Sequence, residues 1–187
     1  MQKKYSLDLL LQIIVLFSSV LIGGLLVALF KKSSGLKLLL SFSGGFLLTI
    51  IFTHILPETY AHFGKNTGIF MLCGFLLQII LEYFSKGVEH GHSHVHGVNN
   101  VFPIVLFISL SLHAFLEAIP IVDVHGHSHG HHHGSSNLLW GVFLHKVPVA
   151  IALITVFKSS NFSTIKSWLF TALFGLMAPL GLVFGQV

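Results

Sequence analysis

Two residues four positions apart carry the clearest chemistry in this chain. His113 and Glu117 fall in the apolar segment S-L-H-A-F-L-E-A-I-P, and their spacing places both on one face of a helix. His145 occurs in the next apolar segment, F-L-H-K-V-P-V-A. Two imidazoles and a carboxylate suit zinc or a neighbouring first-row ion. Three protein ligands leave one coordination position open, as an ion that must enter and leave requires.

The surroundings of these residues make the pattern informative. A charged group at the centre of a bilayer costs about 2.5–3.5 kcal/mol on insertion scales, so such residues usually face a bundle interior and have a function. The alternative is a structural hydrogen-bonded pair of His113 and Glu117, with His145 unrelated to it. The pair together with a second histidine in the next segment favours a metal site.

Three further residues are candidates for the surroundings of the site. Lys146 lies about 100° around a helix from His145, so both cannot face one ligand point. It is either a fixed cation beside the site that pairs with Glu117, or part of a structural ion pair. His54 and Glu58 repeat the spacing of four near the end of another apolar segment. They are either an interfacial capping pair or residues of a metal entrance or pH sensor.

The composition predicts a membrane protein. The chain has 187 residues, of which 53% are hydrophobic and 9% charged, and its mean hydropathy is +0.86. Soluble domains carry about 25% charged residues. The net charge of +4 does not indicate nucleic acid, because the lysines stand singly or in pairs between apolar runs. Cys73 is the single cysteine, which excludes an intrachain disulfide.

The expected fold is all-α: a six-helix transmembrane bundle in one domain, 1–187. A helix needs about 20 apolar residues to span the hydrocarbon core. The segments that qualify or nearly qualify are 9–30, 38–56, 67–84, 101–122, 138–157 and 165–185. We interpret the first as a retained span and not a cleaved signal, since no clear small-residue cleavage site follows it.

Lysine placement predicts the orientation. With the N-terminus outside, inner segments hold six lysines and outer segments three, in the direction of the positive-inside rule. Residues 85–100 would then lie in the cytoplasm and 123–137 outside. We expect the inner (plasma) membrane of a bacterium.

Two histidine-rich loops hold most of the remaining histidines. Four of the 14 histidines lie in 90–96 and six in 125–133. Such Gly/Ser/His stretches cannot build a core. Clustered near-neutral imidazoles bind borderline metals weakly and exchangeably, although a merely solvated linker is the alternative.

Taken together, these motifs resemble the ZIP (Zrt/Irt-like) family of metal transporters. H-A-F-L-E-A is similar to the family's H-S-x-x-E-G signature, and His145-Lys146 resembles the H-K form of one branch. F-T-H-I-L-P-E resembles its H-x-x-P-E motif, and A-P-L-G the segment that follows the metal site. A histidine-rich loop after the third span is also typical. The resemblance extends over nearly the whole chain.

The resemblance implies metal uptake toward the cytoplasm, with His113, Glu117 and His145 as primary ligands. Where some members carry a second carboxylate, this chain has Val149, and Lys146 replaces a ligand of a second site. Both differences favour one metal ion over a pair. The family has eight spans and this chain six. The sequence is therefore a fragment, or another chain completes the bundle, or transport is impaired.

Other functions stay open at this point. A cation diffusion facilitator exporter has six spans and a histidine-rich loop. Members of that family also carry H-x-x-x-D pairs in the second and fifth spans and a soluble C-terminal metal domain, and this sequence shows neither. A membrane metal buffer or sensor would act through the loops alone. We do not expect an enzyme, since no H-E-x-x-H occurs. Zinc, iron, manganese, cobalt or cadmium would be cargo and no cofactor is expected. The expected partners are the ion, the bilayer and a further copy of the chain, without nucleic acid.

Overall fold

The computed structural model describes residues 2–29, 35–85, 101–121, 134–160 and 162–186, and helices dominate these ranges. The α-helices are α1 (Gln2–Leu29), α2 (Leu36–Ile50), α3 (Leu56–Phe63), α4 (Thr67–Ser85), α5 (Val101–Ala118), α6 (Gly134–Ser159) and α7 (Thr164–Phe184). A π-helical turn, η1 (Ile51–Ile55), joins α2 to α3. Short 3₁₀ turns are η2 (Gly64–Asn66) and η4 (Ile119–Ile121).

Five segments of the described chain are long and apolar enough to cross a membrane, one fewer than the six spans expected. They are Asp8–Leu29, Leu36–Tyr83, Pro103–Ile121, Asn137–Ser159 and Thr164–Phe184. The difference arises because the predicted spans 38–56 and 67–84 both fall in the 48-residue segment Leu36–Tyr83. Only the η2 turn separates its two halves, so the helical character is almost continuous.

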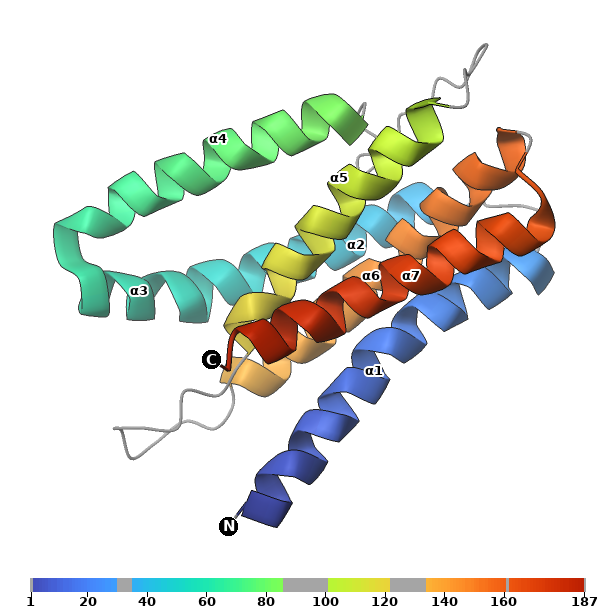
Figure 1. Cartoon of the computed structure of the whole chain (residues 1–187). Coiled ribbons are helices and arrows are strands. Elements are labelled where there is room, and N and C mark those ends of the chain that lie inside the picture. The colour runs from blue at the N-terminus through green and yellow to red at the C-terminus, as the bar shows by residue number, and fades with distance from the viewer. Residues whose placement is uncertain (1, 30–34, 86–100, 122–133, 161, 187) are drawn as a thin grey trace.

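A glycine reverses the chain inside that long segment. Gly64 ends α3 with φ of 55°, a left-handed conformation that costs glycine little because it has no Cβ. Figure 1 shows α4 folding back after this turn, so that Leu36–Ser85 forms an open helical hairpin whose arms meet where α3 contacts α4. We call this segment the hairpin below.

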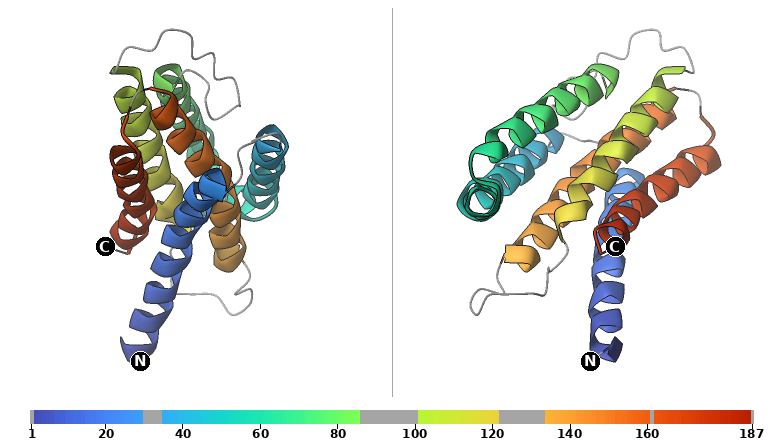
Figure 2. Two further views of the ribbon diagram at one scale, coloured as in Figure 1. Left: turned by 90° about the vertical axis from the view of Figure 1, so that its right-hand side faces the viewer. Right: turned by 60° about the vertical axis from the view of Figure 1, so that its left-hand side comes forward.

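The other four long helices pack together and the hairpin lies against them. Helix α1 packs on α6 and α7, and α5 packs on α7. Of the hairpin arms, α2 packs on α6 and α4 on α5. Figure 2 shows the same arrangement from two further sides. Helix α6 is the most extensively buried of the five candidate spans and thus forms the centre of the bundle.

Close helix contacts fix the helices that carry the candidate ligands. A Cβ on Gly181 of α7 would overlap the carbonyl oxygen of Phe115 on α5, and a Cβ on Gly23 of α1 would lie 2.5 Å from the carbonyl oxygen of Val147 on α6. Small residues that allow such approach are typical of helix contacts in membranes. The backbone is therefore closely packed within two residues of His113, Glu117 and His145.

The outer surface of the bundle is apolar. On α4, large hydrophobic side chains such as Ile69, Phe70, Phe75 and Tyr83 are exposed. A monomeric soluble protein rarely shows a continuous apolar surface of this kind. The long apolar helices and this surface are those of a multi-pass membrane protein.

The histidine-rich loops 90–96 and 125–133 lie outside the described residues. The positions of the helix ends that flank each loop are described. The end of α4 and the start of α5 lie at one end of the bundle, and η4 and the start of α6 at the other (Figure 1). That is the arrangement expected for loops on opposite sides of a membrane, whereas the direction of the chain across it stays a prediction.

Candidate metal site

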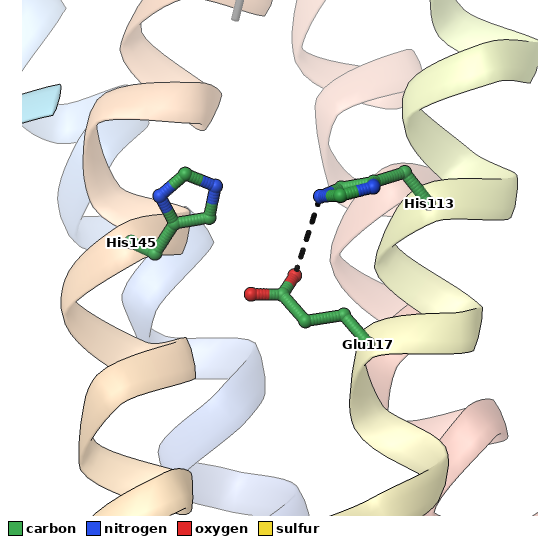
Figure 3. A group of neighbouring side chains, drawn as sticks. All are labelled: His113, Glu117 and His145. Carbon is green, nitrogen blue, oxygen red and sulfur yellow. Dashed lines mark ion pairs between the residues drawn. The ribbon is translucent and has the colours of Figure 1, made fainter. Parts of the chain in front are cut away.

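The three residues singled out from the sequence come together between α5 and α6. One donor atom from each of His113, Glu117 and His145 can be chosen so that all lie within 4.8 Å of one another. Figure 3 shows the two imidazole rings facing each other, with the Glu117 carboxylate below and between them. The convergence expected from the spacing is thus present, and metal binding by these atoms stays a prediction.

The distances are close to those of a bound ion without matching them. Zinc–nitrogen and zinc–oxygen bonds of about 2.0–2.2 Å put neighbouring tetrahedral donors about 3.3 Å apart. The 4.8 Å limit of the cluster therefore has to shrink by about 1.5 Å, which side-chain rotations of two imidazoles and a carboxylate can supply. The ring centroids of His113 and His145 are 6.3 Å apart.

The site lies within the apolar part of the helices and is partly buried, with the His113 and Glu117 side chains 23% and 13% exposed. His145 is 8 residues after the first residue of the candidate span Asn137–Ser159, or roughly 12 Å along a helix of 1.5 Å rise per residue, which is well inside a hydrocarbon core of about 30 Å. One core cluster includes Leu110, Ala114 and Val149, and a second includes Ala118 and Val142. The polar site therefore interrupts an otherwise apolar interior.

Glu117 has two oxygens in different situations. Its Oε2 accepts a hydrogen bond from Lys146 Nζ at 2.9 Å and lies 3.9 Å from His113 Nε2. Its Oε1 is buried and has no hydrogen-bond partner among the described residues. A buried carboxylate oxygen without a partner is costly, so Oε1 is a candidate acceptor on a carboxylate that already belongs to the cluster.

Lys146 forms the ion pair with Glu117 that both alternatives drawn from the sequence require. Its side chain is 2% exposed and pairs with Glu117, and its Nζ lies 5.7 Å from the ring centroid of Phe174 on α7. That distance is within the range of a cation–π contact. Lys146 thus compensates the Glu117 charge at Oε2, the same oxygen that lies 3.9 Å from His113 Nε2.

His54 and Glu58 are not part of this cluster. His54 lies in the π-helical turn and Glu58 in the first turn of α3, and both are exposed. His54 Nδ1 is 2.6 Å from Thr53 Oγ1. Isolated π-helical turns often mark functional sites, but no described contact joins this pair to His113, Glu117 or His145.

Two residues that the sequence did not single out contact the histidines. Gln78 Oε1 lies 3.2 Å from His113 Nδ1, and Ser43 Oγ lies 3.4 Å from His145 Nδ1. Gln78 comes from α4 and Ser43 from α2, so both arms of the hairpin reach the site. A glutamine in the middle of an apolar segment was the one available signal.

Comparison with known proteins adds no assignment. No family model, no curated protein and no solved structure matches this chain. The function has to be inferred from the sequence and from the geometry of the site.

Proposed function

We propose that this protein carries a divalent transition-metal ion, with zinc as the leading candidate, across a bacterial inner membrane toward the cytoplasm. His113, Glu117 and His145 are the ligands. The observation that carries the proposal is their convergence within 4.8 Å between apolar helices, where all three are partly buried. Glu117 Oε1 is itself buried and has no partner among the described residues.

The donor set accounts for the class of ion. Imidazole nitrogen and carboxylate oxygen suit zinc and its first-row neighbours, whereas magnesium and calcium prefer oxygen ligands alone. Iron, manganese, cobalt and cadmium share these preferences closely enough to be alternative cargo.

The incomplete ligand set accounts for movement of the ion. Structural zinc sites are closed by four protein ligands, and three leave a position for water or an exchanging group. The Lys146 ammonium at 2.9 Å from Glu117 repels a divalent cation and competes with it for the carboxylate. Both features favour weak, exchangeable binding of one ion, and the ZIP resemblance implies that Lys146 replaces a ligand of a second ion.

The ZIP resemblance supplies the architecture of the proposal. We infer that each arm of the hairpin crosses the membrane once, which makes six spans in a ZIP-like bundle. The arms Leu36–Phe63 and Thr67–Ser85 are each long enough for a crossing. A ZIP protein would need two further spans, which a second copy or another chain would supply.

The placement of the site favours uptake over the two alternatives. A cation diffusion facilitator exporter would pair ligands from the second and fifth spans, whereas this cluster joins α5 and α6, the fourth and fifth of the inferred crossings. A buffer or sensor acting through the loops would have no need of an unpartnered carboxylate oxygen inside the bundle.

Reconstituted liposomes test the proposal. Initial uptake would be measured for zinc, iron, manganese, cobalt and cadmium with the wild type, with both histidine-rich loops deleted, and with His113→Ala. Removing loop histidines should lower apparent affinity modestly and leave the maximal rate nearly intact. His113→Ala removes one of three ligands and should abolish transport.

The exposed His62, outside the cluster, provides a matched histidine control, and His62→Ala should behave as wild type. The transport rate of His54→Ala should lie between the rates of the loop deletion and of His113→Ala if His54 lies at the entrance. Loss of transport on loop deletion, with transport retained in His113→Ala, would contradict the proposal and favour a buffer or sensor.

A further inference from the structure

We propose that the hairpin sets the tautomer of the metal-binding histidines, with Gln78 as the principal positioning residue. The inference rests on the proposed function, because it concerns the readiness of the same site for an ion. Gln78 contributes no atom to the three-ligand cluster. Its role is to fix which nitrogen of His113 carries the proton.

The contact between Gln78 and His113 defines a tautomer with the amide oxygen of Gln78 facing the ring, as it does in this structure. A carbonyl oxygen only accepts hydrogen bonds, so Gln78 Oε1, at 3.2 Å from Nδ1, accepts from an Nδ1–H group. A neutral imidazole carries one proton. Nε2 of His113 then carries a lone pair that can bind a metal ion, and Nε2 is the atom 3.9 Å from Glu117 Oε2.

The second histidine shows a weaker form of the same arrangement. The Ser43 hydroxyl donates its proton to the Leu40 carbonyl at 3.1 Å, which leaves its oxygen to accept from His145 Nδ1–H at 3.4 Å. Figure 3 shows one ring nitrogen of His145 turned toward His113. The hairpin thus presents one acceptor to the Nδ1 atom of each histidine.

The surroundings of Gln78 on α4 indicate that its side chain serves a partner inside the bundle and does not serve to make the outer surface of the helix polar. Its neighbours Leu77 and Ile79 are exposed apolar side chains, while Gln78 is partly buried and contacts α5. A polar side chain in such a helix is expected to turn inward to a partner. Hydrogen-bond partners of metal-binding histidines fix ring orientation and raise ligand basicity, and their loss typically costs 10–100-fold in metal affinity.

A mere helix-packing role for Gln78 is the alternative, and Ser109 provides the control. Ser109 Oγ donates to the Leu81 carbonyl at 2.7 Å. It joins the same two helices, α5 and α4, one helical turn from His113, without touching a histidine. Ser109→Ala should therefore weaken the contact between α4 and α5 and leave the hydrogen bond of the His113 imidazole unchanged.

Two variants of Gln78 separate the hydrogen bond from the volume of the side chain. Gln78→Met keeps length and removes the acceptor, whereas Gln78→Glu keeps an acceptor and cannot donate. All variants would be made in a protein whose histidines in 90–96 and 125–133 are replaced, and would be studied in lipid nanodiscs.

Nitrogen-15 NMR of the metal-free protein, at a pH above the imidazole range, gives the tautomer of His113 directly, because protonated and lone-pair ring nitrogens resonate far apart. We expect Nδ1–H in the wild type, Gln78→Glu and Ser109→Ala, and a mixed or Nε2–H form in Gln78→Met. The His113 signals are assigned by their loss in His113→Ala. If Gln78→Met does not fold, Gln78→Asn serves, because the shorter amide cannot reach Nδ1.

Zinc titration of the same samples provides the second readout. Affinity should fall 10–100-fold in Gln78→Met and remain near wild type in Gln78→Glu and Ser109→Ala. An Nε2–H wild type, or a Gln78→Met protein that keeps pure Nδ1–H, overturns the positioning role. If the samples show the expected tautomers but none of them binds zinc, the positioning role of Gln78 is upheld and only the proposed function is contradicted.

Discussion

Lys146 Nζ holds Glu117 Oε2 at 2.9 Å, while Glu117 Oε1 has no hydrogen-bond partner among the described residues. One carboxylate therefore serves two purposes. Its Oε2 accepts from Lys146, which lets a charge persist inside an apolar bundle, and lies 3.9 Å from His113 Nε2, whereas its Oε1 is an additional buried acceptor. The lysine thus supplies a counter-charge for Glu117 in the metal-free site.

The first prediction concerns that lysine. Lys146→Met removes the competing cation, so zinc affinity should rise at least about tenfold, or about 1.4 kcal/mol. The metal-free variant should lose about 3–5 kcal/mol of stability, since Glu117 becomes an uncompensated buried charge. Zinc titration and thermal unfolding with and without zinc measure both effects. Lys158→Met, at an exposed lysine in the last turn of α6, is the control. Unchanged or weaker zinc binding in Lys146→Met would show that the lysine does not oppose the ion.

The second prediction concerns Glu117. Glu117→Gln keeps the size of the side chain but removes its charge, and leaves Lys146 buried without a counter-ion. Zinc affinity should fall by at least about a hundredfold, or roughly 2.7 kcal/mol, and transport should cease. Glu58→Gln, at an exposed carboxylate outside the cluster, should retain both. Equal zinc binding in the two variants would remove Glu117 from the ligand set.

The main features of the site were predictable from the sequence because they are local. The spacing of His113 and Glu117 depends only on helical geometry, and the apolar segments identify the helices. Gln78 and Ser43 were not predictable in the same way. Their contacts depend on how α4 packs on α5 and α2 on α6, which no local spacing encodes. The sequence divides 38–56 from 67–84, whereas the structure joins both in the apolar segment Leu36–Tyr83, in which only the three residues of η2 separate α3 from α4.

The third prediction concerns pH. Metal ligation requires neutral imidazole and ionised carboxylate, so protons compete with the ion. With the loop histidines replaced, zinc affinity should weaken steadily as pH falls through the imidazole range, about pH 8 to 5. Titrations at a series of pH values measure this. A flat profile would argue against His113 and His145 as ligands.

The fourth prediction concerns helix packing. Gly181→Ala places a methyl group against the Phe115 carbonyl oxygen and should destabilise the bundle by about 1–3 kcal/mol. Gly45→Ala, on α2 with no atom within 4 Å of the added methyl group, should be neutral or stabilising by up to about 1 kcal/mol. Denaturation in mixed detergent micelles compares the two. Equal stability of the variants would mean that α5 and α7 are not in close contact at this point.

The most direct measurement is X-ray absorption spectroscopy of the zinc-loaded protein after replacement of the histidines in 90–96 and 125–133. The proposal predicts one zinc ion per chain with two imidazole nitrogens and carboxylate oxygen at about 2.0–2.2 Å, and loss of one imidazole from the spectrum in His145→Ala. Zinc that fails to bind once the loop histidines are gone, or that binds with an unchanged spectrum in His145→Ala, would contradict a metal site formed by His113, Glu117 and His145.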